Sequence, residues 1–176
     1  KQPSSFTRLA NLVSSTGKKI TTDTIIDYLN YLEDTWILFP LENYVSKLAD
    51  KVSNKKFYFM DNGILSLFLM DPETSLLENL VAVTLKKRYG DGLYFYHRNI
   101  EVDFYLDEAH KAIQVSYSLK DPETRKREVN ALLKLAENVA VDDLCIITRD
   151  EEEMIVEGEK TIRVVPVWRW LLDDEE

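Results

Sequence analysis

The chain has 176 residues, of which 45% are hydrophobic and 30% are charged, and its formal net charge is −9. This composition is ordinary for a globular protein. No apolar run approaches the ~20 residues of a membrane-spanning helix, so we expect no membrane partner. The single cysteine, Cys145, excludes a disulfide framework, and a cytoplasmic location is the simplest expectation.

The charge is unevenly distributed along the chain. Residues 1–70 hold 8 basic and 7 acidic residues, whereas residues 71–176 hold 14 basic and 24 acidic residues. Because the second part repels a polyphosphate backbone at long range, nucleic-acid binding would have to depend on a local basic patch. The overall charge therefore favours a protein partner.

The N-terminal part is expected to begin with two helices. Apolar positions at helical spacing predict one helix over Ser4–Val13 and a second that ends near Asp34. Strands are predicted at Trp36–Tyr44, where Pro40 suits a sheet edge, and at Lys55–Met60. Two helices followed by a two-stranded ribbon have the outline of a winged helix with one helix fewer than usual.

The remaining sequence alternates strands with helices. A long helix is predicted over Ser75–Tyr89, and Asp121 with Pro122 forms a cap for another helix that runs to about Asn138. The other expected elements are strands at Leu93–His97, Glu101–Leu106, Ala112–Leu119, Leu144–Thr148, Met154–Glu157 and Thr161–Val167, and a last helix at Trp168–Leu172. This order predicts an α/β fold, in which helices flank a mixed sheet.

The two strands Glu101–Leu106 and Ala112–Leu119 form a predicted hairpin that carries polar residues on one side. Strict alternation would place Val102 and Phe104 on one face and Asp103 on the other. On the second strand, Gln114 and Ser116 share a face. The hairpin therefore sets an acid beside an amide and a hydroxyl.

Together with Glu78 on the preceding helix, this hairpin suggests a carboxylate site. Metal-assisted phosphodiester cleavage needs hard oxygen ligands for Mg²⁺ and a cation that stabilises the transition state. Glu78, Asp103 and Gln114 are the candidate metal ligands, and Ser116 supplies no charge. The alternative carries at least equal weight: an ordinary hairpin with a polar face, and Glu78 as a helix-start or core-margin carboxylate.

Other common site chemistries find no support in the sequence. There is no glycine-rich phosphate loop of the G-x-x-x-x-G-K-[ST] or G-x-G-x-x-G type. The histidines are limited to His97 and His110, and a single cysteine offers no pair to hold zinc.

Six strings in fixed order carry a resemblance that covers nearly the whole chain. They are KKFYFMDNGI (55–64), LLENLVAVTLKKR (76–88), EVDFYL (101–106), AIQVSYSL (112–119), DPETRKRE (121–128) and PVWRWLL (166–172). Together they resemble the C-terminal region of a prokaryotic family of predicted AAA-type ATPases. In that family an ATP-binding module precedes a winged-helix segment and a domain of unknown function, which is similar to PD-(D/E)xK restriction endonucleases.

The resemblance implies a winged-helix-like segment at residues 1–70 and a nuclease-like domain at residues 71–176. Glu78 and Asp103 match the nuclease pattern, whereas Gln114 departs from its acid and Ser116 from its lysine. Losing such a lysine costs a nuclease about 3 kcal/mol or more of transition-state stabilisation. We therefore expect a degenerate, catalytically inactive site, with Mg²⁺ bound only if the site is active after all.

The resemblance also implies that ATP binds an upstream AAA module before Lys1 and that this region holds no cofactor of its own. The expected role is a non-catalytic binding or regulatory region that couples the module to a protein or nucleic acid. The alternatives are a Mg²⁺-dependent nuclease with a rearranged site and an oligomerisation module. The best candidate patch for phosphate, or otherwise a solvated wing, consists of Lys47, Lys51, Lys55 and Lys56.

Overall fold

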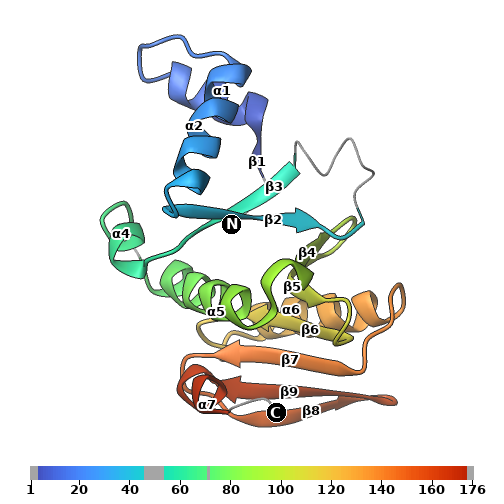
Figure 1. Ribbon diagram of the computed structural model, residues 1–176. Coiled ribbons are helices and arrows are strands. Elements are labelled where there is room, and N and C mark those ends of the chain that lie inside the picture. Colours follow the sequence, from blue (N-terminus) through green and yellow to red (C-terminus); the bar gives the residue numbers. More distant parts are fainter. Residues whose placement is uncertain (1–3, 46–53, 71, 174–176) are drawn as a thin grey trace.

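The computed structural model describes residues 4–45, 54–70 and 72–173, and it has an α/β fold in which helices flank a mixed sheet (Figure 1). The strands lie side by side in the order β1-β3-β2-β4-β5-β6-β7-β9-β8. The strand bounds are β1 Ser4–Ser5, β2 Leu38–Asn43, β3 Asn54–Phe59, β4 Leu93–His97, β5 Glu101–Leu106, β6 Lys111–Val115, β7 Asp143–Thr148, β8 Glu153–Glu157 and β9 Lys160–Pro166. The helix bounds are α1 Phe6–Ser14, α2 Thr22–Asp34, α4 Asn62–Ser66, α5 Glu73–Tyr89, α6 Pro122–Ala136 and α7 Val167–Leu172, with a 3₁₀ turn, η1, at Gly90–Gly92.

Each helix and strand expected from the sequence has a counterpart, because local signals fix most of them. Thr21 caps α2 by accepting a hydrogen bond from the Thr24 N–H, and Asp121 caps α6 by accepting one from the Thr124 N–H. The prediction of a mixed sheet flanked by helices is confirmed. Among the described residues, no helix combines the length and the apolar character that crossing a bilayer requires.

Strand β2 joins the two parts of the chain. It pairs antiparallel with β3 and, over Glu42–Tyr94 and Asn43–Phe95, parallel with β4. As a whole β2 is not an edge strand, but at Pro40 it pairs with β3 alone, so the proline lies at a local edge of the sheet. A proline is compatible with this position because Pro40 precedes the stretch of β2 that pairs with β4.

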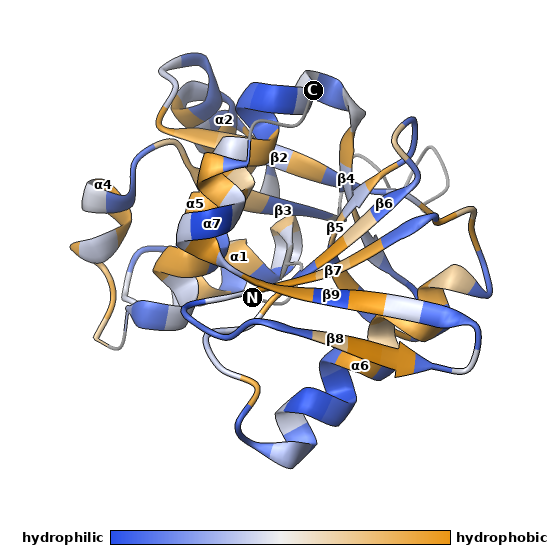
Figure 2. Ribbon diagram, turned by 90° about the horizontal axis from the view of Figure 1, so that it is seen from below, coloured by the Kyte–Doolittle hydropathy of each residue, from blue (hydrophilic) through white to orange (hydrophobic). Residues whose placement is uncertain are grey.

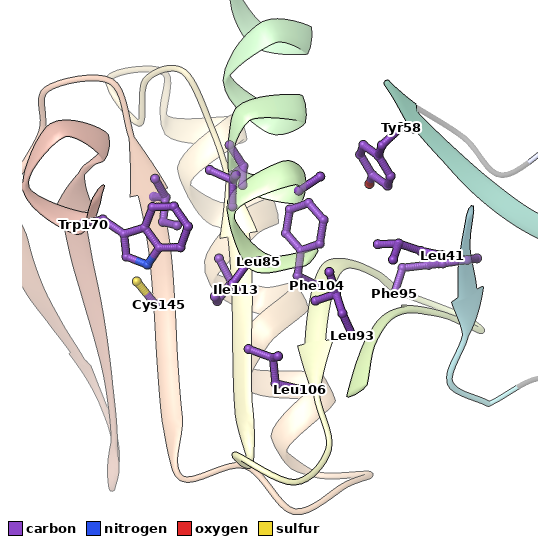
Figure 3. Close-up of a cluster of buried hydrophobic side chains, with 14 of the residues drawn as sticks. Leu41, Tyr58, Leu85, Leu93, Phe95, Phe104, Leu106, Ile113, Cys145 and Trp170 are labelled. Atoms are coloured by element: carbon purple, nitrogen blue, oxygen red, sulfur yellow. The ribbon is translucent and has the colours of Figure 1, made fainter. Parts of the chain in front are cut away.

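Helices cover both faces of the central sheet and define two cores (Figure 2). We call the first the α5-side core; it contains Leu85 of α5, Phe104 and Ile113 of the sheet, and Trp170 of α7 (Figure 3). The second, the α6-side core, is built around Leu132 and its neighbours on α6. Strand β7 has parallel neighbours on both sides and is buried on both faces, as its continuous apolar run predicts.

Strand β5 contains a bulge at the hairpin. Its pairing with β4 steps from Tyr94–Tyr105 to Tyr96–Val102, so β5 uses three residues where β4 uses two. As a result Val102 packs in the α6-side core, whereas Phe104 packs in the α5-side core. The prediction that Val102 and Phe104 share a face is therefore wrong, because strict alternation fails at a bulge.

Candidate carboxylate–lysine site

Asn79, a fully buried residue of α5, fixes strand β3 against that helix. Its Oδ1 accepts a hydrogen bond from the Phe59 N–H (2.9 Å), and its Nδ2 donates to Phe59 O (2.8 Å) and to Asn62 Oδ1 (2.9 Å). One amide thus satisfies both backbone groups at the end of β3. The side chains of Lys56 and Tyr58 on β3 are thereby held over the hairpin of β5 and β6.

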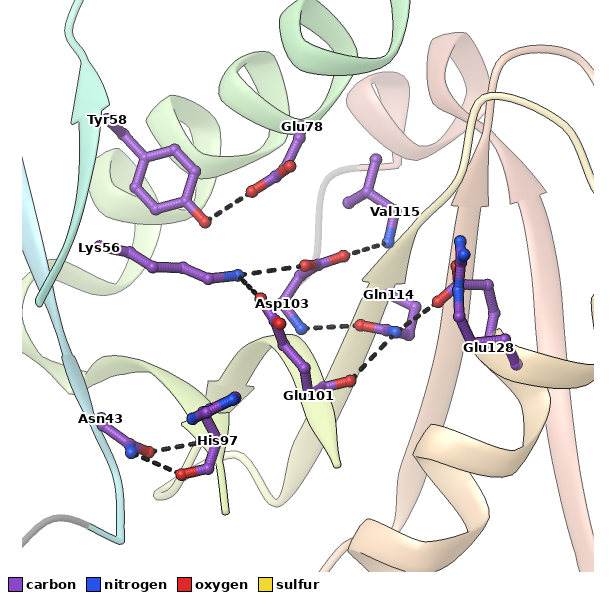
Figure 4. Close-up of polar contacts among 11 residues, drawn as sticks. Asn43, Lys56, Tyr58, Glu78, His97, Glu101, Asp103, Gln114, Val115 and Glu128 are labelled. Carbon is purple, nitrogen blue, oxygen red and sulfur yellow. Dashed lines mark hydrogen bonds and ion pairs between the residues drawn. The ribbon is translucent and has the colours of Figure 1, made fainter. Parts of the chain in front are cut away.

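Lys56 is the cation of the site, and it is only 4% exposed. Its ammonium group forms ion pairs with Glu101 and Asp103 (Figure 4). The Nζ atom lies 2.6 Å from Glu101 Oε1, 3.4 Å from Asp103 Oδ1 and 5.5 Å from the centre of the Phe95 ring. Burial acts to lower the pKa of Lys56, but the charges of Asp103, Glu78 and Glu101 outweigh burial and raise the pKa to about 12. Lys56 is therefore a charged, buried side chain that carboxylates hold in place.

Asp103 lies at the bulge, where β5 and β6 separate. Regular backbone pairing between β5 and β6 ends at Phe104–Ile113. Beyond this pair, hydrogen bonds from side chains replace the backbone hydrogen bonds between the strands. Asp103 Oδ2 accepts a hydrogen bond from the Val115 N–H (3.0 Å), and the Asp103 N–H donates to Gln114 Oε1 (2.7 Å). Burial raises the pKa of the Asp103 carboxyl to about 6, a rise that Lys56 opposes and Glu78 reinforces.

Gln114 links the separated hairpin to helix α6. Its Nε2 donates to Glu128 Oε2 (2.5 Å) and more weakly to Glu101 O (3.4 Å), while Glu128 Oε1 accepts from Arg127. Because Gln114 Oε1 already accepts the Asp103 N–H, both ends of the amide have protein partners. The residue expected to be a metal ligand acts here as a connector between three elements.

Glu78 is the third predicted ligand and lies within α5 at the margin of the core. It is 8% exposed, and its Oε1 accepts a hydrogen bond from the Tyr58 hydroxyl (2.9 Å). Burial and the nearby carboxylates raise the pKa of Tyr58 well above its usual value. Tyr58 therefore remains a hydrogen-bond donor over the physiological pH range.

The acidic and amide side chains of the site, but not Lys56 or Tyr58, line a cavity of about 590 Å³. Of the four predicted nuclease-like positions, Glu78, Asp103 and Gln114 reach the cavity, and Ser116 does not. Ser116 is buried, and its hydroxyl donates to Ser118 O (3.0 Å). Among the described residues, no three His, Cys, Asp or Glu side chains are arranged to hold a metal ion.

Of the four lysines of the expected phosphate-binding patch, the structure describes Lys55 and Lys56. Lys56 belongs to the carboxylate site, so its placement in a surface patch is wrong. Lys55, its neighbour, is half-buried and lines a separate cavity of about 630 Å³ beside α2 and the end of α5. Lys47 and Lys51 lie outside the described residues.

Sequence reasoning missed the role of Lys56, although a signal was present. In KKFYFM, Lys56 and Tyr58 are two residues apart and point to the same side of the strand, the side that packs on α5. The same alternation places Lys55 with Phe57, which packs against α1 and α2. Applying the period of two to this strand would have assigned Lys56 to the buried face.

Replacing Gln114 by alanine is expected to lower the free energy of unfolding by about 2 kcal/mol, because it leaves the Asp103 N–H and Glu128 without their neutral partner. Urea unfolding checks this value. Asn130→Ala is the matched control, because Asn130 is an exposed amide that lines the same cavity. Equal losses in the two variants would contradict the connector role.

Two comparisons find relatives of unassigned function. A family described as "Domain of unknown function (DUF8612)" matches residues 1–75. "Uncharacterized protein MJ1544" of Methanocaldococcus jannaschii is 32% identical over 180 residues, which cover 96% of this chain and 40% of that protein. The chain thus spans less than half the length of this curated relative. No solved structure matches the chain.

Proposed function

We propose that this chain is a non-catalytic binding or regulatory region of an AAA-type ATPase. It is built on a nuclease-like fold in which a lysine of the same chain forms ion pairs with the carboxylates of the site. The observation that carries the proposal is the position of Lys56 Nζ between Glu101 and Asp103, at 2.6 and 3.4 Å. In this proposal, the Lys56 ammonium group takes the place of the metal ion that a nuclease of this kind would bind between its carboxylates.

The hydrogen bonds of the site support an inactive role. Mg²⁺ requires oxygen ligands at 2.0–2.1 Å in nearly octahedral geometry. Here Asp103 accepts from Lys56 and from the Val115 N–H, and Gln114 Oε1 accepts from the Asp103 N–H. A metal ion would have to displace a buried ammonium group and leave it without a partner, which is costly.

The ATPase assignment rests on the ordered motifs and on the length of the archaeal relative. That relative extends well beyond the matched region, so in that protein the shared region is joined to further sequence. The net negative charge of residues 71–176 favours a protein over nucleic acid as the partner. A glycine-rich phosphate loop in natural sequence upstream of Lys1 would support the assignment, and an unrelated upstream sequence would contradict it.

Titration of the protein with MnCl₂ or MgCl₂ is expected to give no saturable heat in calorimetry, because Lys56 already neutralises the carboxylates. Single- and double-stranded DNA and RNA are expected to stay intact in the presence of either metal. Asp103→Asn is the control, and we expect it to behave as the wild type does in both assays. Saturable Mn²⁺ binding and cleavage that disappear in Asp103→Asn would overturn the proposal.

The second candidate function is a Mg²⁺-dependent nuclease with a rearranged site. The observation that favours it is that Lys56 brings an ammonium group within 3.4 Å of Asp103, although Ser116 lacks one. In this case Lys56 would supply the charge stabilisation that the pattern normally takes from the hairpin. Lys56→Met would then abolish cleavage, whereas Lys56→Arg, which keeps the charge, would retain part of it.

A further inference from the structure

Strand β8 forms one end of the sheet, next to β9 (Figures 1 and 2). Within residues 4–45, 54–70 and 72–173, no strand pairs with its outer side. Proteins usually protect such an edge with charged side chains, especially lysine, or with a proline or a bulge. The sequence of β8, EMIVE, has a glutamate at each end but no charged residue or proline at its three central positions, and its five pairs with β9 are regular.

The turn between β8 and β9 determines which backbone groups face outward. Glu157 and Lys160 flank a two-residue turn whose first residue, Gly158, has a φ of 61°, as a type II′ hairpin requires. In such a hairpin the flanking residues form a hydrogen-bonded pair, and this pairing recurs at every second residue. Ile155 is therefore bonded to β9, while the N–H and C=O groups of Met154 and Val156 point away from the sheet.

The side chains at this edge are also suited to a partner strand. Met154 and Val156 are 61% and 68% exposed, whereas Ile155 is buried in the α6-side core. A cavity of about 580 Å³ opens beside Met154, lined by Val165, Arg169 and others. A strand added to a sheet edge gains affinity from backbone hydrogen bonds and specificity from pockets for alternate side chains.

The charge around β8 indicates the kind of strand that would bind. Residues 150–160 contain six acidic residues and one lysine, and two of the acids, Glu152 and Glu153, already form ion pairs with Arg169 and Arg125. In a second copy paired antiparallel about Ile155, Glu153 would lie opposite Glu157, and like charges directly opposite each other destabilise a sheet. Glu157 and Glu159 are exposed at the hairpin end of this edge, so a basic segment would meet complementary charge there.

We infer that the outer edge of β8 binds an extended, basic segment of a partner protein as an added strand, with apolar side chains against Met154 and Val156. This binding surface lies apart from the carboxylate site and is independent of the function proposed for that site. The segment recognised is one in which lysine or arginine alternates with apolar residues.

The test uses a labelled peptide of about nine residues in which lysine alternates with valine, a length typical of a strand. Fluorescence anisotropy should show saturable binding that weakens as salt rises. An acidic peptide with glutamate in place of lysine should bind at least about tenfold more weakly. Val156→Pro, which removes an outward N–H, should weaken binding about five- to tenfold, whereas Val156→Thr, which keeps it, should not.

Amide hydrogen exchange locates the contact without a substitution. The amides of Met154 and Val156 should exchange fast in the free protein and slow down when the basic peptide is bound, while the Ile155 amide is protected in both states. Failure of the basic peptide to slow exchange at Met154 and Val156 would overturn the inference. Equal binding of the basic and acidic peptides would also overturn it.

Discussion

Replacing Lys56 by methionine is expected to lower the free energy of unfolding by about 3–5 kcal/mol, the usual cost of breaking a buried ion pair from one side. The side chain is 4% exposed and its ammonium group lies between Glu101 and Asp103. Methionine fills a similar volume, so the loss reports the carboxylates that remain buried without a counter-charge. Urea unfolding measures the change.

Two further variants separate charge pairing from simple packing. Lys55→Met, one residue away on the opposite face of β3, should change stability by no more than about 0.5 kcal/mol. The triple variant Lys56→Met, Glu101→Gln, Asp103→Asn should recover part of the loss, because it removes the charges together. If the triple variant is less stable than Lys56→Met alone, the ion-pair explanation fails.

The stability of the wild type relative to Asp103→Asn is expected to fall by about 3 kcal/mol as the pH rises from about 4 to about 6. The folded protein raises the pKa of Asp103 to about 6, whereas an unfolded aspartate titrates near 3.9. A raised pKa means that the folded state holds the proton more tightly. The stabilisation is therefore complete below pH ~4 and is lost as the pH passes through 6.

The difference between the two proteins isolates this single group. Arginine, lysine and hydrogen-bond partners lower the pKa values of Asp91, Asp121 and Glu153, and these groups give the opposite trend, with stability lost as the pH falls. Their contributions to the free energy of unfolding are the same in the wild type and in Asp103→Asn, so they cancel when one free energy is subtracted from the other. Urea unfolding at several pH values from 3.5 to 7 provides the comparison, and a difference that stays flat over this range would contradict the raised pKa.

Local sequence signals predicted most elements, and long-range contacts determined the rest. The Asp121–Pro122 cap could be recognised because the cap and the helix it starts lie within four residues. The bulge in β5 could not be predicted, because the position of Asp103 depends on contacts outside its own strand. Its carboxylate accepts hydrogen bonds from the Val115 N–H and from Lys56, which is 47 residues away in the sequence. Because it also depends on long-range contacts, the candidate site was predicted only in part: Asp103 and Gln114 were identified, but the role of Lys56 was not.

Gln114 illustrates the limit most clearly. Sequence pattern placed it correctly beside Asp103, and both line the same cavity. Its function as a connector depends on Glu128 of helix α6, which covers the face of the sheet opposite to α5. No periodicity within the hairpin contains that information.

The hydrogen bonds of Asn79 and the ion pairs of Lys56 have a consequence for how this protein can be divided. Lys56 comes from the N-terminal part, while Glu78, Glu101 and Asp103 come from the C-terminal part. A shortened protein that starts after residue 70 would lack Lys56, so these acids would have no counter-charge. We expect such a protein to fold poorly near neutral pH.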